Sequence, residues 1–177
     1  MNNQKSKRKW MLIFLVVALL TIAADQFTKH LTLLYLKDQA PFSIIDGVLE
    51  LHFFANTGIA WSMLEGQLLF IIFMGIVFLS VMLIFVCKLP DKKKFHILYV
   101  LCGLLAGGAL GNMIDRIRLG YVVDFIYFSL INFPVFNVAD CCIVISIIWA
   151  CILFLFIYKD DDLSFLNFKQ KKFREIK

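Results

Sequence analysis

The sequence has few of the residues that mark common hydrolases. Only three histidines occur among 177 residues, and they are scattered, at His30, His52 and His96. There is no His-Glu-x-x-His pair and no Gly-x-Ser-x-Gly elbow, which disfavours zinc-dependent and Ser-His-Asp chemistry. The five cysteines lie in or beside apolar runs and form no CxxC spacing, so we expect neither a metal nor a redox cofactor.

Charge is also scarce. Charged residues make up 18% of the chain and hydrophobic residues 61%, with a mean hydropathy of +0.83. A soluble domain of this size could not bury so much apolar surface, since about half apolar is usual. The net charge of +5 comes from basic clusters that flank apolar runs. These clusters indicate membrane topology and contact with lipid headgroups rather than nucleic-acid binding.

Four apolar segments predict an all-α polytopic membrane protein. Each is near the roughly 20 residues needed to cross a bilayer, and their expected ranges are 10–36, 67–87, 97–114 and 138–158. The first segment has no Ala-x-Ala-like exit, so we expect a retained anchor. The basic clusters before the first span, in the loop 88–96 and in the tail 159–177 would share one side. The positive-inside rule makes that side, with both termini, cytoplasmic.

Two loops would then face outward. The first, about 37–65, partly alternates apolar and polar residues and contains Asp46-Gly47, which predicts a short hairpin or small sheet. The second, about 116–136, is short and semi-apolar. We find no internal repeat or linker, and therefore expect a single membrane domain over residues 1–177.

Helical rise places acids from three spans at one depth. Asp25 lies about 22 Å from the cytoplasmic end, and Asp115 and Asp140 about 28 Å from it, in a hydrocarbon core about 30 Å thick. Asp124, in the second outer loop, can fold back to the same level. The convergence predicts a polar pocket at the outer edge of the bilayer.

Several polar residues have two interpretations. Asp25 and Lys29 are one helical turn apart, and form either a self-neutralising pair or a scaffold for a loop or helix. Asn56 could bind a substrate backbone and Gly58 could allow close approach, with Trp61 at the membrane interface. Taken alone, this segment indicates a turn with an aromatic-belt residue rather than a substrate-binding site.

The third span carries a small-residue segment, Gly107 to Asn112, that favours close helix packing. Asn112 and Arg116 lie on one face and favour a polar pocket, since neither suits contact with lipid. Asp115 is a third candidate for a catalytic role, although the adjacent Arg116 favours a structural ion pair between these two neighbours.

Asp124 and Asp140 differ from the other acids because both have apolar neighbours and no basic one. Desolvation and mutual repulsion would let such a pair share a proton. One carboxylate could then activate water while the other protonates the leaving amine, as in aspartic proteases. The alternative is two helix-end carboxylates, since Asp140 falls in the first turn of the last helix.

Together these residues resemble bacterial lipoprotein signal peptidase (signal peptidase II, aspartic peptidase family A8). The resemblance covers about residues 10–158 and rests on five motifs in order: Asp25-Gln-Phe-Thr-Lys29, Asn56-Thr-Gly-Ile-Ala-Trp61, Gly111-Asn-Met-Ile-Asp-Arg116, Gly120-Tyr-Val-Val-Asp-Phe125 and Phe136-Asn-Val-Ala-Asp140.

The resemblance implies an aspartic endopeptidase of the bacterial cytoplasmic membrane. It would cut diacylglyceryl-modified prolipoproteins on the amino side of the lipidated cysteine, and globomycin-type inhibitors would block it. Asp124 and Asp140 would form the catalytic dyad. The implied polar shell is Asn56, Gly58, Asn112, Arg116 and Asn137, and the implied structural supports are Asp25, Lys29, Asp115 and Trp61. The family fold also implies a small extracytoplasmic β-cradle after the first helix and a short helix in the second outer loop.

Two rivals remain open from the residues alone. A small transporter or proton relay could use the same acids, although the inner halves of the spans are nearly bare of ionisable groups. A non-catalytic membrane subunit would not need them. The expected partners are prolipoproteins and membrane lipids, with no nucleic acid, and the chain is expected to act as a monomer.

Overall fold

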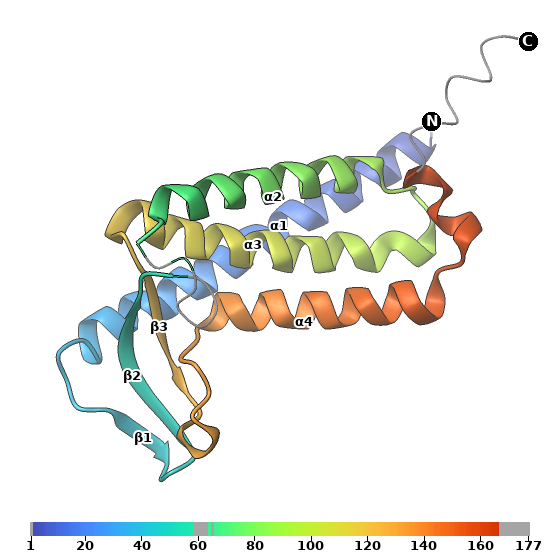
Figure 1. Cartoon of the computed structure of the whole chain (residues 1–177). Helices are drawn as coiled ribbons and strands as arrows, with labels where there is room; N and C mark the ends of the chain where they lie inside the picture. The colour runs from blue at the N-terminus through green and yellow to red at the C-terminus, as the bar shows by residue number, and fades with distance from the viewer. Residues whose placement is uncertain (1, 59–63, 65, 167–177) are drawn as a thin grey trace, which may run out of the picture.

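Four long helices form the body of the protein, and a small sheet projects from one end of them (Figure 1). The structure is a computed structural model that describes residues 2–58, 64 and 66–166. Within these residues, four helices are long and apolar enough to cross a membrane, which confirms the predicted fold class. The helices are α1 (Asn2–Tyr35), α2 (Leu68–Lys88), α3 (His96–Leu119) and α4 (Val138–Ile152), the last continued by a π-helical turn over Leu153–Ile157.

Helix α3 is central and packs against α1, α2 and α4. Small residues allow the close approach. A Cβ atom added to Gly107 would lie 2.5 Å from Cβ of Thr21 on α1, and one added to Gly108 would lie 2.7 Å from the carbonyl oxygen of Ala139 on α4. The glycines predicted to mediate packing therefore do so on two sides of the same helix.

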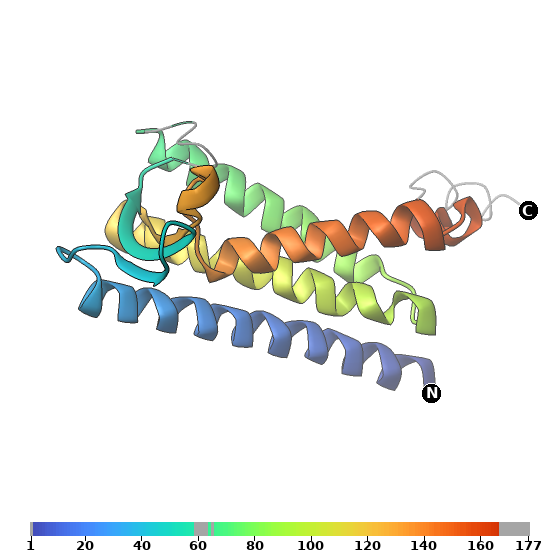
Figure 2. The ribbon, with the colours of Figure 1, turned by 90° about the horizontal axis from the view of Figure 1, so that it is seen from below.

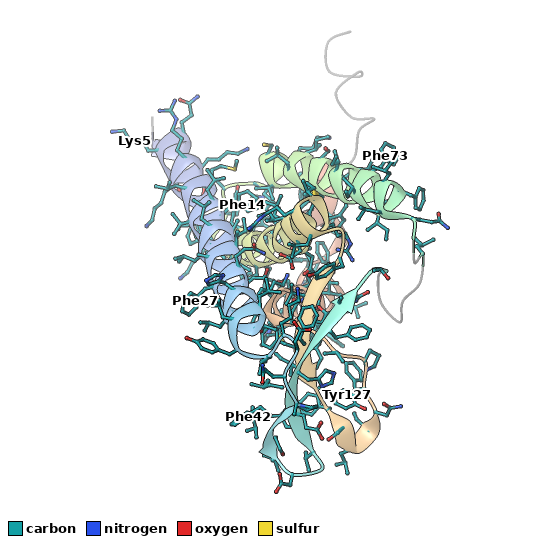
Figure 3. All side chains as sticks on the ribbon, turned by 90° about the vertical axis from the view of Figure 1, so that its left-hand side faces the viewer. Lys5, Phe14, Phe27, Phe42, Phe73 and Tyr127 are labelled. Atoms are coloured by element: carbon teal, nitrogen blue, oxygen red, sulfur yellow. The ribbon has the colours of Figure 1, made fainter. Side chains whose placement is uncertain are left out.

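The outward faces of the helices are apolar. Phe27 on α1 and Phe73 on α2 are 63% and 58% exposed, whereas Phe14 is 5% exposed between α1 and α3; all three are labelled in Figure 3. Exposed large apolar side chains continue along the other spans. Lipid is the solvent that suits such a surface.

The sheet has three antiparallel strands in the order β1-β2-β3: β1 (Phe42–Ile45), β2 (Leu49–Asn56) and β3 (Val122–Tyr127). The predicted hairpin is present: β1 and β2 are joined around Asp46 and Gly47, and Gly47 adopts φ +70°.

Strand β3 was not predicted. It comes from the second outer loop, where only a short helix was implied; that helix is present as a 3₁₀ turn, Ser129–Ile131. Val122 to Phe125 are buried where β3 pairs with β2, and such a short apolar run has no periodicity that separates strand from helix.

Helix α3 extends five residues beyond its expected membrane span, to Leu119. It ends at Gly120, whose φ of +84° is that of a left-handed C-cap and whose N–H donates to Arg116 O. Asp115 and Arg116 therefore lie on a rigid helix and not at the start of a loop.

The opposite end of the bundle holds the start of α1 and the last described element, the 3₁₀ helix Asp160–Leu166, far from the sheet (Figure 2). There the π-helical turn is followed by Tyr158, whose hydroxyl donates to Lys94 O. Residues 167–177 of the expected cytoplasmic tail lie outside the described residues.

Candidate active site

Asp124 and Asp140 are brought together by two elements that follow each other in the chain. Asp124 lies on β3, and Asp140 lies in the first turn of α4. Asn137, the N-cap of α4, joins them: its Nδ2 donates to Asp124 Oδ1 at 2.6 Å, and its backbone N–H donates to Asp140 Oδ2 at 3.1 Å. The predicted pair is therefore one cluster.

A capping box fixes Asp140. The side chain of Asn137 accepts from the backbone N–H of Asp140 at 3.0 Å, while the carboxylate of Asp140 accepts from the backbone N–H of Asn137. These reciprocal bonds satisfy two free helix donors. They also hold the carboxylate at the positive end of the helix dipole.

Two further asparagines complete the polar shell. Asn56, at the end of β2, donates to Asp124 Oδ2 at 2.9 Å. Asn112, on α3, donates to Asp140 Oδ1 at 2.8 Å and accepts from Asn137 Nδ2 at 3.1 Å. All four oxygens of the two carboxyl groups thus accept a hydrogen bond from an asparagine, and the three asparagines come from different elements.

The environment of Asp124 favours its protonated form. The side chain is only 1% exposed. Burial, and then the nearby charge of Asp140, raise the pKa of Asp124 to about 7, against the smaller opposing effect of the bonds from Asn56 and Asn137. Two adjacent carboxyl groups, one of which titrates near neutrality, are suited to acid–base catalysis.

Arg116 ties the end of β2 to α3. Its Nη2 donates to Gly58 O at 2.6 Å and its Nη1 to Asn112 O at 3.4 Å. The N–H of Gly58 in turn donates to Asn56 Oδ1 at 3.0 Å. Gly58 therefore joins the shell through its backbone. Trp61, expected as a support, lies outside the described residues.

The supporting residues centre on Lys29, which is 2% exposed. Its Nζ lies 2.9 Å from Asp25 Oδ2 and 3.0 Å from Asp115 Oδ2, and donates to Asn112 Oδ1 at 2.8 Å. The ion-pair partner of Asp115 is thus Lys29, and the expected pairing with Arg116 is wrong. Sequence adjacency misled because neighbouring residues on a helix point in different directions.

Each supporting acid also holds the backbone beside one site aspartate. Asp115 Oδ2 accepts from the N–H of Val123, just before Asp124, at 3.1 Å. Asp25 Oδ1 accepts from the N–H of Ala139, just before Asp140, at 3.1 Å. Of the two interpretations of Asp25 and Lys29, this geometry favours the scaffold.

Sequence reasoning gave Gln26 no role, yet it links the two supporting acids. Its Nε2 donates to Asp115 Oδ1 at 2.9 Å, to Gly111 O at 3.2 Å and to Asp25 Oδ2 at 3.3 Å. The signal was a polar amide next to Asp25 inside an apolar span, a position where an unpaired amide is costly.

The carboxyl pair opens onto a cavity of about 1340 Å³. Most of its wall is apolar and comes from α2, α3, α4 and residues 132–136. Its polar residues include Asn56, Asn112, Arg116, Asp124 and Asp140, and its apolar ones include Phe70, Met74, Phe78, Ile143 and Val144. An apolar groove with two carboxyl groups at its polar end can hold a hydrophobic chain and hydrolyse a bond beside it.

Among the described residues, no three His, Cys, Asp or Glu side chains are grouped so as to hold a metal ion.

Comparison with known proteins gives a consistent result. The family model described as signal peptidase (SPase) II matches residues 17–156. The chain is 37% identical to the lipoprotein signal peptidase of Enterococcus faecalis over 85% of its length and 91% of that protein. It is 41% identical to that of Caldanaerobacter subterraneus subsp. tengcongensis over 80% and 95%.

Two solved structures, both described as bacterial membrane enzymes, share the fold. One has a TM-score of 0.73 at 32% identity and covers 80% of this chain and 87% of its own. The other has a TM-score of 0.71 at 32% identity and covers 82% and 94%. The transporter alternative finds no support in these relatives. The family match over residues 17–156 and the identities over most of the chain show that this protein belongs to the signal peptidase II family.

Proposed function

We propose that Asp124 and Asp140 are the catalytic dyad with which this signal peptidase II hydrolyses its substrate. Membership of the family makes the protein an aspartic peptidase that removes signal peptides from prolipoproteins. The observation that carries the dyad assignment is Asn137, which bonds both carboxyl groups at the polar end of a large apolar cavity.

The two aspartates divide the chemistry. Because the pKa of Asp124 is raised to about 7, Asp124 holds the shared proton and polarises the scissile carbonyl. Asp140 acts as the base that takes a proton from the attacking water. Collapse of the tetrahedral intermediate then passes the proton of Asp124 to the leaving amine.

The cavity suits a substrate that is partly lipid. Its apolar wall between α2 and α4 would take the signal peptide and the diacylglyceryl chains, so that the bond on the amino side of the modified cysteine reaches the dyad. Asn56 and Arg116, which line the cavity beside the dyad, and Gly58, to which Arg116 donates, would fix the peptide backbone. All of these groups come from one chain, so we expect a monomer to be active.

We place the protein in the bacterial cytoplasmic membrane, with both termini cytoplasmic and the dyad at the outer leaflet. The support is charge. At the end of the bundle away from the sheet, α1 begins and α2 ends (Figure 1), and the chain there carries Lys5, Lys7, Arg8, Lys9, Lys88 and Lys92 to Lys94. A substrate anchored in the outer leaflet would then meet the carboxyl groups where water is available.

The test is cleavage of a diacylglyceryl-modified lipobox peptide by the purified protein. We expect Asp124→Asn and Asp140→Asn each to abolish cleavage, by at least roughly 10³-fold, and globomycin to inhibit the wild type. Asp46→Asn makes the same chemical change at the exposed hairpin turn and should keep full activity. Activity in either dyad variant that matches the wild type would remove that residue from the dyad.

A further inference from the structure

A second cavity, of about 870 Å³, lies at the end of the bundle opposite the sheet. It is an open hollow lined by the first turns of α1 and by the segment that follows α2; Lys5, labelled in Figure 3, marks this end of α1. The residues that line it are Gln4, Lys7, Arg8, Met11, Leu12, Leu15, Lys88, Leu89, Pro90, Asp91 and Phe165. We call it the basic cavity.

The rim of the basic cavity is cationic. Lys7 and Arg8 come from α1, and Lys88 is the last residue of α2. Lys7 is held in place, because its Nζ donates to Cys87 O at 2.7 Å. An ammonium group carries three donors, so Lys7 keeps hydrogen-bonding capacity for a ligand.

The one acidic residue in the lining is already engaged. Asp91 Oδ1 accepts from Ser6 Oγ at 2.9 Å and lies 3.1 Å from His96 Nε2. The hydrogen bond with His96, and then the one from Ser6, lower the pKa of Asp91. The negative charge of Asp91 is thus already engaged by these two neighbours. Lys7 and Arg8 against this one acid leave the cavity positive.

The floor of the basic cavity is apolar. Met11 and Leu12 follow Lys7 and Arg8 by four residues, one helical turn further along the same face of α1. Leu12 is 60% exposed, and Leu15, a turn further along, is 51% exposed. Cations at the membrane boundary above an uncovered apolar strip match an amphiphile with an anionic head and an acyl tail.

We propose that the basic cavity binds an anionic glycerophospholipid from the adjoining leaflet. The phosphate accepts hydrogen bonds from Lys7 and Arg8, and one acyl chain covers Leu12 and Leu15. A signal peptide is a poor occupant, because its amino-terminal region is itself basic. The site lies at the other end of the helices from the dyad and is independent of the proposed cleavage.

The full-length protein in neutral detergent tests this directly. Short-chain phosphatidylglycerol should raise the thermal unfolding midpoint in a saturable way, whereas phosphatidylcholine of equal chain length and inorganic phosphate should not. The double variant Lys7→Gln with Arg8→Gln should weaken phosphatidylglycerol binding roughly 30-fold, the combined effect of two basic side chains beside an anionic headgroup.

The matched control is Lys5→Gln with Lys9→Gln, which removes the same charge from the same turns of α1 but does not touch the cavity; it should bind nearly as the wild type does. If loss of the Lys7 contact to Cys87 impairs folding of the double variant, Arg8→Gln alone replaces it and is expected to weaken binding roughly fivefold. Equal losses in the two double variants would reduce the effect to bulk charge and overturn the proposal. An equal midpoint shift with phosphatidylcholine or with phosphate, or no shift with phosphatidylglycerol, would also overturn it.

Discussion

The carboxyl group of Asp124 is nearly inaccessible to solvent, and its pKa is raised to near neutral pH. Burial and Asp140 raise its pKa to about 7, and the bond from Asn56 opposes that rise. If Asp124 is the acid, activity requires it to be protonated. We therefore expect kcat/KM to fall as the pH rises above about 7.

Asn56→Ala makes this expectation specific to Asp124. Removing the Nδ2 donor takes a hydrogen bond away from the charged form, so the pKa of Asp124 should rise further. The basic limb of the pH profile should then move to higher pH, whatever happens to the absolute rate. An unmoved limb in Asn56→Ala would assign that ionisation to another group.

The same shift makes a prediction about stability. Folding raises the pKa of Asp124 from its ordinary 3.8 to about 7, so between these values the folded state holds a proton that the unfolded state has lost. The contribution of Asp124 is complete below about pH 3.8 and is lost as the pH rises through 7, at about 1.4 kcal/mol per pKa unit. Asp124→Asn removes this dependence, so its unfolding midpoint relative to the wild type should be higher at pH 8 than at pH 5. An identical difference at both pH values would contradict the buried, proton-holding state.

The residues that the structure brings together were visible in the sequence where charge marked them. Asp25, Lys29, Asp124 and Asp140 were identifiable because ionisable groups are costly in an apolar chain. Gln26 was missed because an amide gives a weaker signal, although it bonds to both supporting acids.

At the scale of elements, the dyad depends on how α1 and α3 hold β3 and α4. Asp115 on α3 binds the backbone of β3 at Val123, and Asp25 on α1 binds that of α4 at Ala139. Lys29 joins the two acids. A shift of α1 against α3 would thus be passed to both aspartates of the proposed dyad, and positional errors of this kind are costly in catalysis.

Gly111→Ala tests this coupling, because a Cβ at Gly111 would contact the carboxylate of Asp25. We expect it to separate α1 from α3, destabilise the fold by about 1–3 kcal/mol and lower kcat more than it raises KM. Gly75→Ala is the control: its Cβ would meet only the flexible end of Met113, at 2.5 Å, so its unfolding midpoint should stay near that of the wild type. Equal losses of stability in the two variants would mean that the contact between Gly111 and Asp25 does not hold α1 against α3.

Elements were predicted unevenly for a physical reason. Membrane helices are long apolar runs and are visible in the sequence, and the hairpin at Gly47 carries its own turn signal. Strand β3 has neither feature, since it exists through pairing with β2, about seventy residues earlier in the chain. The strand that holds Asp124 is thus a long-range feature, whereas Asp140 sits on a helix whose Asn137 cap is local.

For the whole molecule, the two ends of the bundle differ in charge and in function. The sheet lies at one end of the bundle, and α1 begins and α2 ends at the other (Figure 1). Asp124 is on the sheet, whereas Lys5, Arg8, Lys9 and Lys92 to Lys94, which are exposed, belong to the segments at the other end. The positive-inside rule predicts that the second end is cytoplasmic, and in that orientation a lipid-anchored substrate would reach the proposed dyad from the outer leaflet. The proposed function therefore depends on orientation as much as on the carboxyl groups.

Orientation can be measured by thiol labelling in intact bacterial cells. Asp46→Cys places a thiol at the exposed turn of the sheet, and Lys93→Cys places one at the exposed basic end. We expect a membrane-impermeant maleimide to label the first variant in intact cells and the second only after permeabilisation. The wild type supplies the background from its five native cysteines. Labelling of Lys93→Cys in intact cells would show that the topology is the reverse of the proposed one. The dyad would then lie at the cytoplasmic face and could not meet a substrate held in the outer leaflet.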